Sequence, residues 1–314
     1  MRTLYPLFLF LLSCGTVQKL GLRSTGPVFK NAGDLTVRER NWDFFQKSSP
    51  SSLKLTELIF LQDTDNQVLH LSLIKGYAGY AFGVSETLTL EDEIIGLVDS
   101  IHRKEAIEMY TRSLDYGLDY LNRKGIDRKD LLSLSEKDLL KKLDKNVEEK
   151  DYTAVLYTGQ SWGSLINFQK DNMALVAQVP RVKILFDWVC SKKPDLENGV
   201  CDIFFAQYEA SRPRMLGGNP EKAKELYLSA MKKQPKNLLI RLGYIQYLLL
   251  PALEIEPYEK EALILKKEFA KWEDMKRDDL QNHSPYKDYQ DLNLFNAIAK
   301  KRFDIIEKHK AKIF

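Results

Sequence analysis

Apolar residues recur at intervals of three and four positions along nearly the whole of this 314-residue chain. That spacing places them on one face of an α-helix, whereas a half-buried β-strand needs an alternation that few segments show. The pattern therefore predicts an all-α fold. We expect helices over residues 35–46, 52–61, 66–82, 89–99, 102–123, 136–143, 153–165, 173–189, 201–210, 220–233, 238–250, 258–271 and 292–310.

One segment has the spacing of a helical repeat. Ala223, Tyr227 and Ala230, followed by Pro235, reproduce the pattern of the second helix of a tetratricopeptide repeat. The small residues allow a neighbouring helix to approach, the tyrosine fills the space between them, and a weaker copy lies at 106–113. We expect an irregular tetratricopeptide-like helical repeat array, an α-α superhelix; the alternative is a helical bundle in which the spacing arose by chance.

The first 13 residues have the pattern of a cleaved export signal. Arg2 precedes an apolar run of about half the roughly 20 residues that span a bilayer, so we expect a signal peptide rather than a membrane-spanning helix. The run ends in the sequence LLSC, which resembles the lipobox of bacterial lipoproteins. Cleavage there would leave Cys14 as a lipid-bearing N-terminus. The alternative is an ordinary signal peptide with a cysteine at this position by chance.

The residues after Cys14 predict a tether and a destination. Gly15 stands where an aspartate would signal retention in the inner membrane, so the usual sorting rule favours the periplasmic side of the outer membrane. Residues 14–34 lack sustained apolar periodicity and are expected to form a flexible, lipid-anchored tether. We expect residues 35–314 to form a single helical domain.

Composition excludes several kinds of partner. Acidic and basic residues are interleaved and the formal net charge is +3, so no block of like charge predicts a nucleic-acid surface. The four histidines have no histidine or cysteine partner at helical spacing, and we expect no metal site. No glycine-rich phosphate loop occurs in the sequence, and no cofactor is expected.

Two cysteines are left once Cys14 carries a lipid. Cys190 and Cys201 bracket a segment whose middle has loop residues, so they can face each other across a corner between two helices. An oxidising compartment would permit a disulfide between them. Two buried thiols are the alternative that the sequence leaves open.

A serine hydrolase is a further hypothesis. Residues 159–163, with the sequence GQSWG, match the G-x-S-x-G nucleophile elbow, which makes Ser161 a candidate nucleophile, and residues 152–157 can be read as the strand before it. An elbow also needs a parallel sheet and a later Asp and His, whereas the rest of the chain is helical and only His283 and His309 follow. We therefore expect that the protein is not an enzyme.

Several segments, in order along the chain, resemble the signatures of the TatT family, the tetratricopeptide-containing lipoproteins associated with TRAP transporters. They are residues 53–57, 106–112, 156–166 with Asp171, 179–182 and 212–223. The last of these, RPRMLGGNPEKA, is similar to the family's Pro-x-x-Leu-Gly-Gly turn leading into a repeat helix. Together the segments cover roughly residues 40 to 275.

The resemblance implies an all-α fold with tetratricopeptide-like repeats and without catalytic activity. It also implies association with the periplasmic solute-binding protein of a TRAP transporter, a tendency to form homotrimers, and an internal cleft for a small hydrophobic or anionic ligand. In this interpretation the GQSWG segment is a turn and the start of a helix. The main alternative is a tetratricopeptide lipoprotein that acts as a scaffold for protein assembly at the outer membrane.

Residues that would line the cleft are chosen from the concave side of the expected repeats. The ligand-binding candidates are Tyr77, Tyr80, Trp162, Asn167, Asp171, Tyr208, Arg212 and Arg214. The aromatic candidates can equally be core residues. Arg212 and Arg214, beside a Gly-Gly turn, can present their guanidinium groups to an anion, or can pair instead with Glu209 or Glu221.

Overall fold

The computed structural model describes residues 33, 35–275 and 285–314 of the chain. These residues form α-helices and short π- and 3-10-helical segments, without a β-strand, and the predicted all-α class is confirmed. None of the described helices combines the length and apolar character that crossing a membrane requires. The predicted signal peptide and Cys14, with nearly all of the tether, lie outside the described residues.

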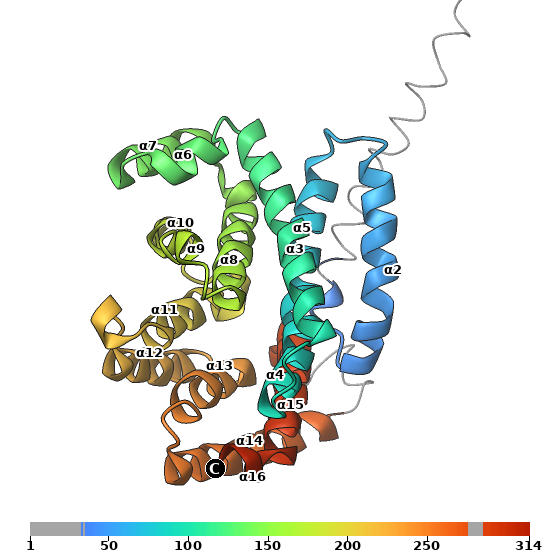
Figure 1. Ribbon diagram of the computed structural model, residues 1–314. Helices are drawn as coiled ribbons and strands as arrows, with labels where there is room; N and C mark the ends of the chain where they lie inside the picture. Colours follow the sequence, from blue (N-terminus) through green and yellow to red (C-terminus); the bar gives the residue numbers. More distant parts are fainter. Residues whose placement is uncertain (1–32, 34, 276–284) are drawn as a thin grey trace, which may run out of the picture.

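The N-terminal third consists of long helices that pack side by side (Figure 1). The elements are α2 (Trp42–Phe60), α3 (Gln67–Tyr80), the π-helical η1 (Ala81–Ser85), α4 (Glu86–Ile94) and α5 (Ile101–Arg123). Asn41, Asn66 and Ser100 cap α2, α3 and α5, because each side-chain oxygen accepts a hydrogen bond from a first-turn N–H. Helix α3 packs against both α2 and α5, which places it inside the molecule.

The middle third forms one wall of the molecule. Its elements are α6 (Arg128–Ser133), α7 (Glu136–Asn146), η2 (Glu149–Asp151), α8 (Tyr152–Phe168), α9 (Met173–Val176) and α10 (Val179–Lys192). Helix α8 packs against α3, α5 and α10 and contributes much of a buried cluster with α5, α7 and α10. This first core is centred on Leu156, Leu185 and Phe186, all nearly or fully buried.

The last third turns back toward the N-terminal helices. Its elements are η3 (Leu196–Gly199), α11 (Val200–Ser211), η4 (Arg214–Leu216), α12 (Pro220–Lys233), α13 (Leu238–Tyr244), the π-helical η5 (Ile245–Leu249), α14 (Ile255–Asp274), η7 (Pro285–Leu292), α15 (Asn293–Lys308) and α16 (Lys310–Ile313). Helix α15 lies beside α4 (Figure 1) and packs against α2 and α13. The Leu294 N–H donates to the Val37 carbonyl (2.9 Å), so the start of α15 contacts the segment that precedes α2.

The face that predicted a repeat helix is buried. Ala223, Tyr227 and Ala230 are fully buried in a second core formed chiefly by α12 to α15, and α12 packs against α11 and α13. The Tyr227 ring lies where a Cβ added at Gly243 would approach it to 3.2 Å, so the glycine makes room for the tyrosine. The arrangement of these helices as tetratricopeptide repeats stays a prediction.

Three helix predictions were wrong in detail. Helix α2 is continuous where two helices, 35–46 and 52–61, were expected, because the serines around Pro50 donate to carbonyls one turn earlier rather than capping a new helix. The expected helix 173–189 is divided before α10, in which Pro180 occupies the first turn and lacks an N–H for a preceding helix. Helix α6 was missed.

Candidate functional site

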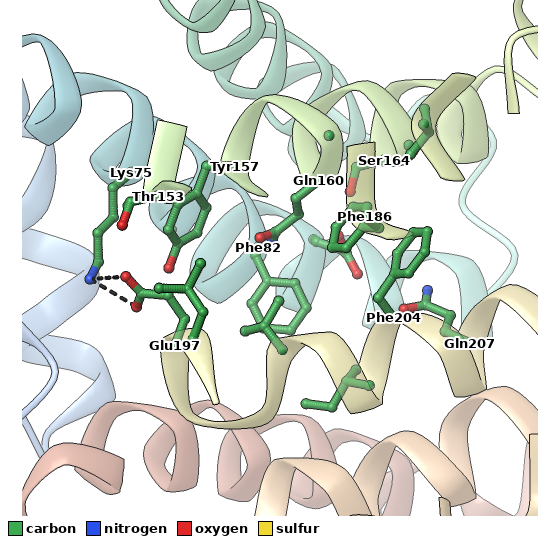
Figure 2. A pocket seen from close by; sticks show the side chains of 18 of the residues that line it. Lys75, Phe82, Thr153, Tyr157, Gln160, Ser164, Phe186, Glu197, Phe204 and Gln207 are labelled. Atoms are coloured by element: carbon green, nitrogen blue, oxygen red, sulfur yellow. Dashed lines mark hydrogen bonds and ion pairs between the residues drawn. The ribbon is translucent and has the colours of Figure 1, made fainter. Parts of the chain in front are cut away.

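A cavity of about 1150 Å³ lies between the two cores. It is bordered by α3, α8, α10, α11 and α15, with η1 and η3 contributing at its edges. Its walls are predominantly apolar, and most of the side chains in the close-up view converge from α8, α10 and α11 (Figure 2). The cavity is large enough for a small organic ligand and depends on helices from all parts of the described chain.

Aromatic rings form the apolar wall. Phe186 of α10 and Phe204 of α11 stack with their ring centroids 3.5 Å apart and their planes nearly parallel. Phe82 of η1 faces the same space (Figure 2). A Cβ added at Gly159 would approach the Phe186 ring to 3.1 Å, so this glycine of the GQSWG segment lets α10 come close to α8. Flat, rigid rings of this kind offer a large contact area to an apolar ligand.

A charged pair stands at one end of the cavity (Figure 2). The Lys75 Nζ donates to both carboxylate oxygens of Glu197, at 2.8 and 2.9 Å, and the two side chains are 28% and 12% exposed. The Tyr157 hydroxyl points toward Glu197 (Figure 2). Burial raises the pKa of Tyr157, and the Glu197 carboxylate raises it further, so the hydroxyl keeps its proton and can donate a hydrogen bond.

Neutral polar side chains lie along the rest of the wall. Gln160 and Ser164 of α8 and Gln207 of α11 line the cavity (Figure 2). In this view Tyr157 lies between Lys75 and Gln160, and Ser164 and Gln207 lie farther from Lys75. A few polar groups among apolar walls are what a pocket needs to orient a ligand without binding every apolar molecule equally.

A second charged cluster, centred on Glu86, borders another part of the cavity. Glu86 lines the cavity and accepts hydrogen bonds from Tyr110 (2.6 Å) and Tyr247 (3.2 Å), with the Arg302 guanidinium 3.4 Å away. Arg302 is 1% exposed and also donates to the Phe82 carbonyl at 2.6 Å. Phe82 and Tyr247 belong to the two π-helical segments η1 and η5, a local geometry that is frequent at functional sites.

Three of the eight ligand-binding candidates line the cavity: Asn167, Tyr208 and Arg212. The Arg212 guanidinium stacks on the Tyr208 ring at 3.7 Å and donates to Glu209 (3.2 Å) and to the Leu216 carbonyl (3.1 Å). The guanidinium is therefore already hydrogen-bonded within the turn after α11. Asn167 is exposed near the end of α8.

The other five candidates lie outside the cavity lining. Tyr77 and Tyr80 are core residues, with Tyr77 stacked on Tyr116 (5.9 Å) and the Tyr80 hydroxyl donating to Glu105 (3.3 Å). Trp162 is also buried, and it donates its indole N–H to Gln178 (2.9 Å).

Asp171 and Arg214 are at the surface. Asp171 is exposed in the segment between α8 and α9, and Arg214, 72% exposed, pairs with Glu221 at 2.6 Å. The structure thus brings one part of the predicted set, Asn167, Tyr208 and Arg212, to the cavity and places the remainder elsewhere.

The GQSWG segment lies within α8, which begins at Tyr152. Both earlier interpretations of it were wrong: it is not preceded by a strand, and it is not a turn at the start of a helix. Ser161 is fully buried, and its hydroxyl donates to the Ser113 hydroxyl (2.8 Å), which in turn donates to the Ile74 carbonyl. A nucleophile elbow holds its serine exposed on a sharp strand-to-helix turn, and this geometry is absent from α8.

Cys190 and Cys201 form a disulfide that joins the end of α10 to the start of α11. The bridge closes a loop that contains η3 and therefore Glu197. Within the residues that the structure describes, no group of three or more His, Cys, Asp or Glu side chains is placed to hold a metal ion.

Lys75 and Glu197 were absent from the sequence-based set, although one of them has a recognisable signal. Lys75 is the only Lys, Arg, Asp or Glu between residues 68 and 84, a run dominated by apolar residues and glycine. A lone charge in such a run must find a partner or a cavity when the helix is buried. Glu197 precedes Asn198 and Gly199, a dipeptide typical of turns, but the sequence does not indicate which side chain of the turn would face the cavity.

Comparison with protein families gives a family for the chain. The family model described as TAtT, TRAP transporter T-component, matches residues 38–268, which include α2, α3, α8, α10 and α11. No curated protein matches the chain. The match confirms the resemblance inferred from the ordered sequence segments. The chain belongs to the TRAP transporter T-component family.

Proposed function

We propose that this protein is a lipid-anchored periplasmic accessory protein of a TRAP-type transport system, which binds a small ligand in its helical cavity. Family membership supports the TRAP association and an envelope-associated, periplasmic role. One observation carries ligand binding: an apolar cavity of about 1150 Å³ whose few polar groups include a charged pair at one end. Walls of this kind are typical of pockets for small organic molecules.

The cavity can be blocked by a single substitution. Gly79 of α3 lines the cavity, and a Cβ added there meets no atom within 4 Å. A side chain at this position therefore has room to leave the helix, and Gly79→Trp is expected to place an indole in the cavity. Gly79→Ala is the matched control, because it adds only a Cβ to the same helix and leaves most of the volume free.

Mass spectrometry of small molecules extracted from purified protein tests the proposal. We expect a ligand to be recovered from the unsubstituted protein and from Gly79→Ala, and to be largely lost from Gly79→Trp. Equal recovery from all three proteins would mean that the molecule binds elsewhere. Protein that carries no ligand but captures outer-membrane proteins would support the alternative of a tetratricopeptide scaffold.

The proposed partner is the periplasmic solute-binding protein of the same transport system. In this proposal the two proteins capture or pass the ligand together, and the T-component assembles as a homotrimer. Co-purification of the two proteins, with and without the Gly79→Trp substitution, tests the partnership. Analytical ultracentrifugation of the protein alone tests the trimer.

The proposed lipid anchor on Cys14 places the protein on the periplasmic side of the outer membrane. Two or more acyl chains make such anchoring effectively permanent. We expect that replacing residues 1–14 by an ordinary cleavable export signal releases a folded protein into the soluble periplasmic fraction. A folded variant that stayed in the membrane fraction would contradict the anchor.

A further inference from the structure

The cavity lining is predominantly apolar, and the ion pair of Lys75 and Glu197 stands at one end of it (Figure 2). The other ion pair whose two members both line the cavity, Lys193 with Glu149, is 39% and 72% exposed and therefore well hydrated. Lys75 and Glu197 are 28% and 12% exposed and meet beside the apolar wall. An ammonium group in that position needs an anion, and Glu197 supplies it from within the chain.

Glu197 is held in place by an unusual turn. Glu197 and Asn198 both have left-handed backbone conformations, with φ of 53° and 55°, and Gly199 continues the turn with φ of 91°. Non-glycine residues adopt this conformation rarely, because the Cβ then lies too close to the following carbonyl oxygen. Two consecutive residues of this kind persist only when their surroundings fix them.

The surroundings do fix the turn. The disulfide between Cys190 and Cys201 closes the loop around it, and the Asn237 side chain donates to the Asn198 carbonyl at 2.8 Å. The Asn198 side chain donates to the Asp291 carbonyl at 3.0 Å, which ties the turn to η7. These bonds place the carboxylate of Glu197 at the Lys75 ammonium despite an unfavourable backbone.

Charge along the lining favours an anionic guest over a cationic one. The basic residues of the lining are Lys75, Lys150, Lys170, Lys193 and Arg212, and the acidic ones are Glu86, Glu149 and Glu197. Glu86 is paired with Arg302, and three of the basic residues are paired as well: Lys150 with Glu148, Lys193 with Glu149 and Arg212 with Glu209. Lys75 is paired with Glu197. Removing Glu197 from Lys75 would therefore leave a net positive lining that attracts a carboxylate.

We propose that Glu197 occupies the position of a ligand carboxylate, and that the cavity takes an amphipathic monocarboxylate whose acid group replaces Glu197 at Lys75. The apolar body of this ligand lies along Phe82, Phe186 and Phe204, and the protonated Tyr157 donates to the same carboxylate. This inference rests on the proposed ligand-binding function and names the chemical class of the ligand. Glu197 competes with the ligand, so binding requires the ion pair to open.

Three ligands with one chain length and different head groups test the inference. Decanoate, decanol and decylammonium are titrated calorimetrically into residues 15–314, which lack the signal and the lipid-bearing cysteine and therefore need no detergent. We expect decanoate to bind about tenfold more tightly than decanol, the difference made by roughly one charge-assisted hydrogen bond. Decylammonium is expected to bind more weakly than either.

Two substitutions then test separately the role of Glu197 as competitor and the role of Lys75 as the residue that binds the carboxylate. Glu197→Gln removes the competing charge and should tighten decanoate binding by about tenfold while leaving decanol unchanged. Lys75→Met removes the anchor and should abolish the preference for decanoate over decanol. Lys192→Met is the control, because this lysine pairs with Asp144 at 2.8 Å outside the cavity lining and should leave all three affinities unchanged.

The outcomes distinguish this inference from the proposed function. Decanol and decanoate that bind equally, and are both excluded by Gly79→Trp, would overturn the carboxylate inference but keep the ligand-binding cavity. Tighter binding of decylammonium, or weaker decanoate binding by Glu197→Gln, would also overturn it. If none of the three binds, the inference fails, and the extraction experiment decides the proposed function separately.

Discussion

Two of the ion pairs at the cavity, Arg302 with Glu86 and Lys75 with Glu197, are built in different ways. Arg302 is 1% exposed, and it donates to Phe82 and Thr87 as well as facing Glu86. Lys75 is 28% exposed and bonds only to Glu197 among the side-chain partners found for it in the described chain. One pair is fixed by several helices, whereas the other depends on a single carboxylate.

This difference indicates which of the two carboxylates a ligand can displace. Displacing Glu86 from Arg302 would leave a guanidinium buried without its counter-charge and would break hydrogen bonds from two tyrosines, at a cost of several kcal/mol. Displacing Glu197 costs less, because a ligand carboxylate replaces it directly and Glu197 can turn toward water. We therefore interpret the Arg302 cluster as structural support and the Lys75 pair as exchangeable.

The largest expected effect is from Arg302→Met. This change leaves the partly buried Glu86 beside the cavity without its cation, and we expect a loss of about 3–5 kcal/mol in the free energy of unfolding. Urea denaturation followed by circular dichroism measures it. The control is Arg112→Met, whose side chain is 42% exposed, with an expected loss below about 1 kcal/mol. Similar losses in the two variants would remove the distinction between the pairs.

Local signals in the sequence were sufficient for much of the fold. The helix expected over residues 220–233 is α12, because Asn219 caps it and Pro220 occupies its first turn. The buried face formed by Ala223, Tyr227 and Ala230 was also predictable from spacing alone. These features depend on residues within one or two helical turns of each other.

The cavity could not be predicted in the same way. Lys75 and Glu197 are 122 positions apart, and they meet only because α3 packs inside the molecule while η3 forms a left-handed turn. Trp162 shows the opposite case: its position on α8 was recognised, but which face of that helix the cavity would occupy depends on the packing of α10 and α11. The sequence thus predicts the helices but not which of their faces enclose the cavity.

The next effect concerns the disulfide, which closes the loop around Glu197 and makes no contribution to the Arg302 cluster. In the chain-entropy description, closing a loop of this length stabilises the fold by about 3 kcal/mol, and replacing Cys190 and Cys201 together by Ser should remove most of that. Urea denaturation with and without dithiothreitol measures the loss. The reductant should have no effect on the double variant; an effect there would point to another thiol.

A third ion pair, Asp151 with Lys124, has neither residue in the cavity lining. It tests whether a pair stabilises the fold because it has several hydrogen bonds, independently of its position. Asp151 is fully buried outside the cavity lining and accepts hydrogen bonds from Tyr120 (2.5 Å) and the Glu148 N–H (3.0 Å), with Lys124 at 3.0 Å. Burial alone would raise the pKa of Asp151, but these hydrogen bonds and Lys124 outweigh it and hold the pKa below its ordinary value.

The depressed pKa sets the sign of the pH dependence. The stability that Asp151 provides is fully present above the ordinary aspartate pKa and is lost as the pH falls through the lower folded-state value. We expect Asp151→Asn to cost about 1–3 kcal/mol at pH 7. The difference in the free energy of unfolding between this variant and the unsubstituted protein should become smaller as the pH is lowered from about 7 to about 3, a range that includes the ordinary carboxylate pKa. Urea denaturation at each pH measures it. A pH-independent difference would show that the loss comes from packing.

The smallest expected effect on stability is from Lys75→Met. Because the pair is partly hydrated and Glu197 can turn toward solvent when its partner is removed, we expect a loss of only about 1 kcal/mol or less. The methionine keeps the length of the side chain and its contacts with the cavity wall. Urea denaturation beside Arg302→Met measures the contrast, and a loss as large as that of Arg302→Met would mean that Lys75 and Glu197 are structural. Such a pair could not open for a ligand, because the fold itself would depend on its remaining closed.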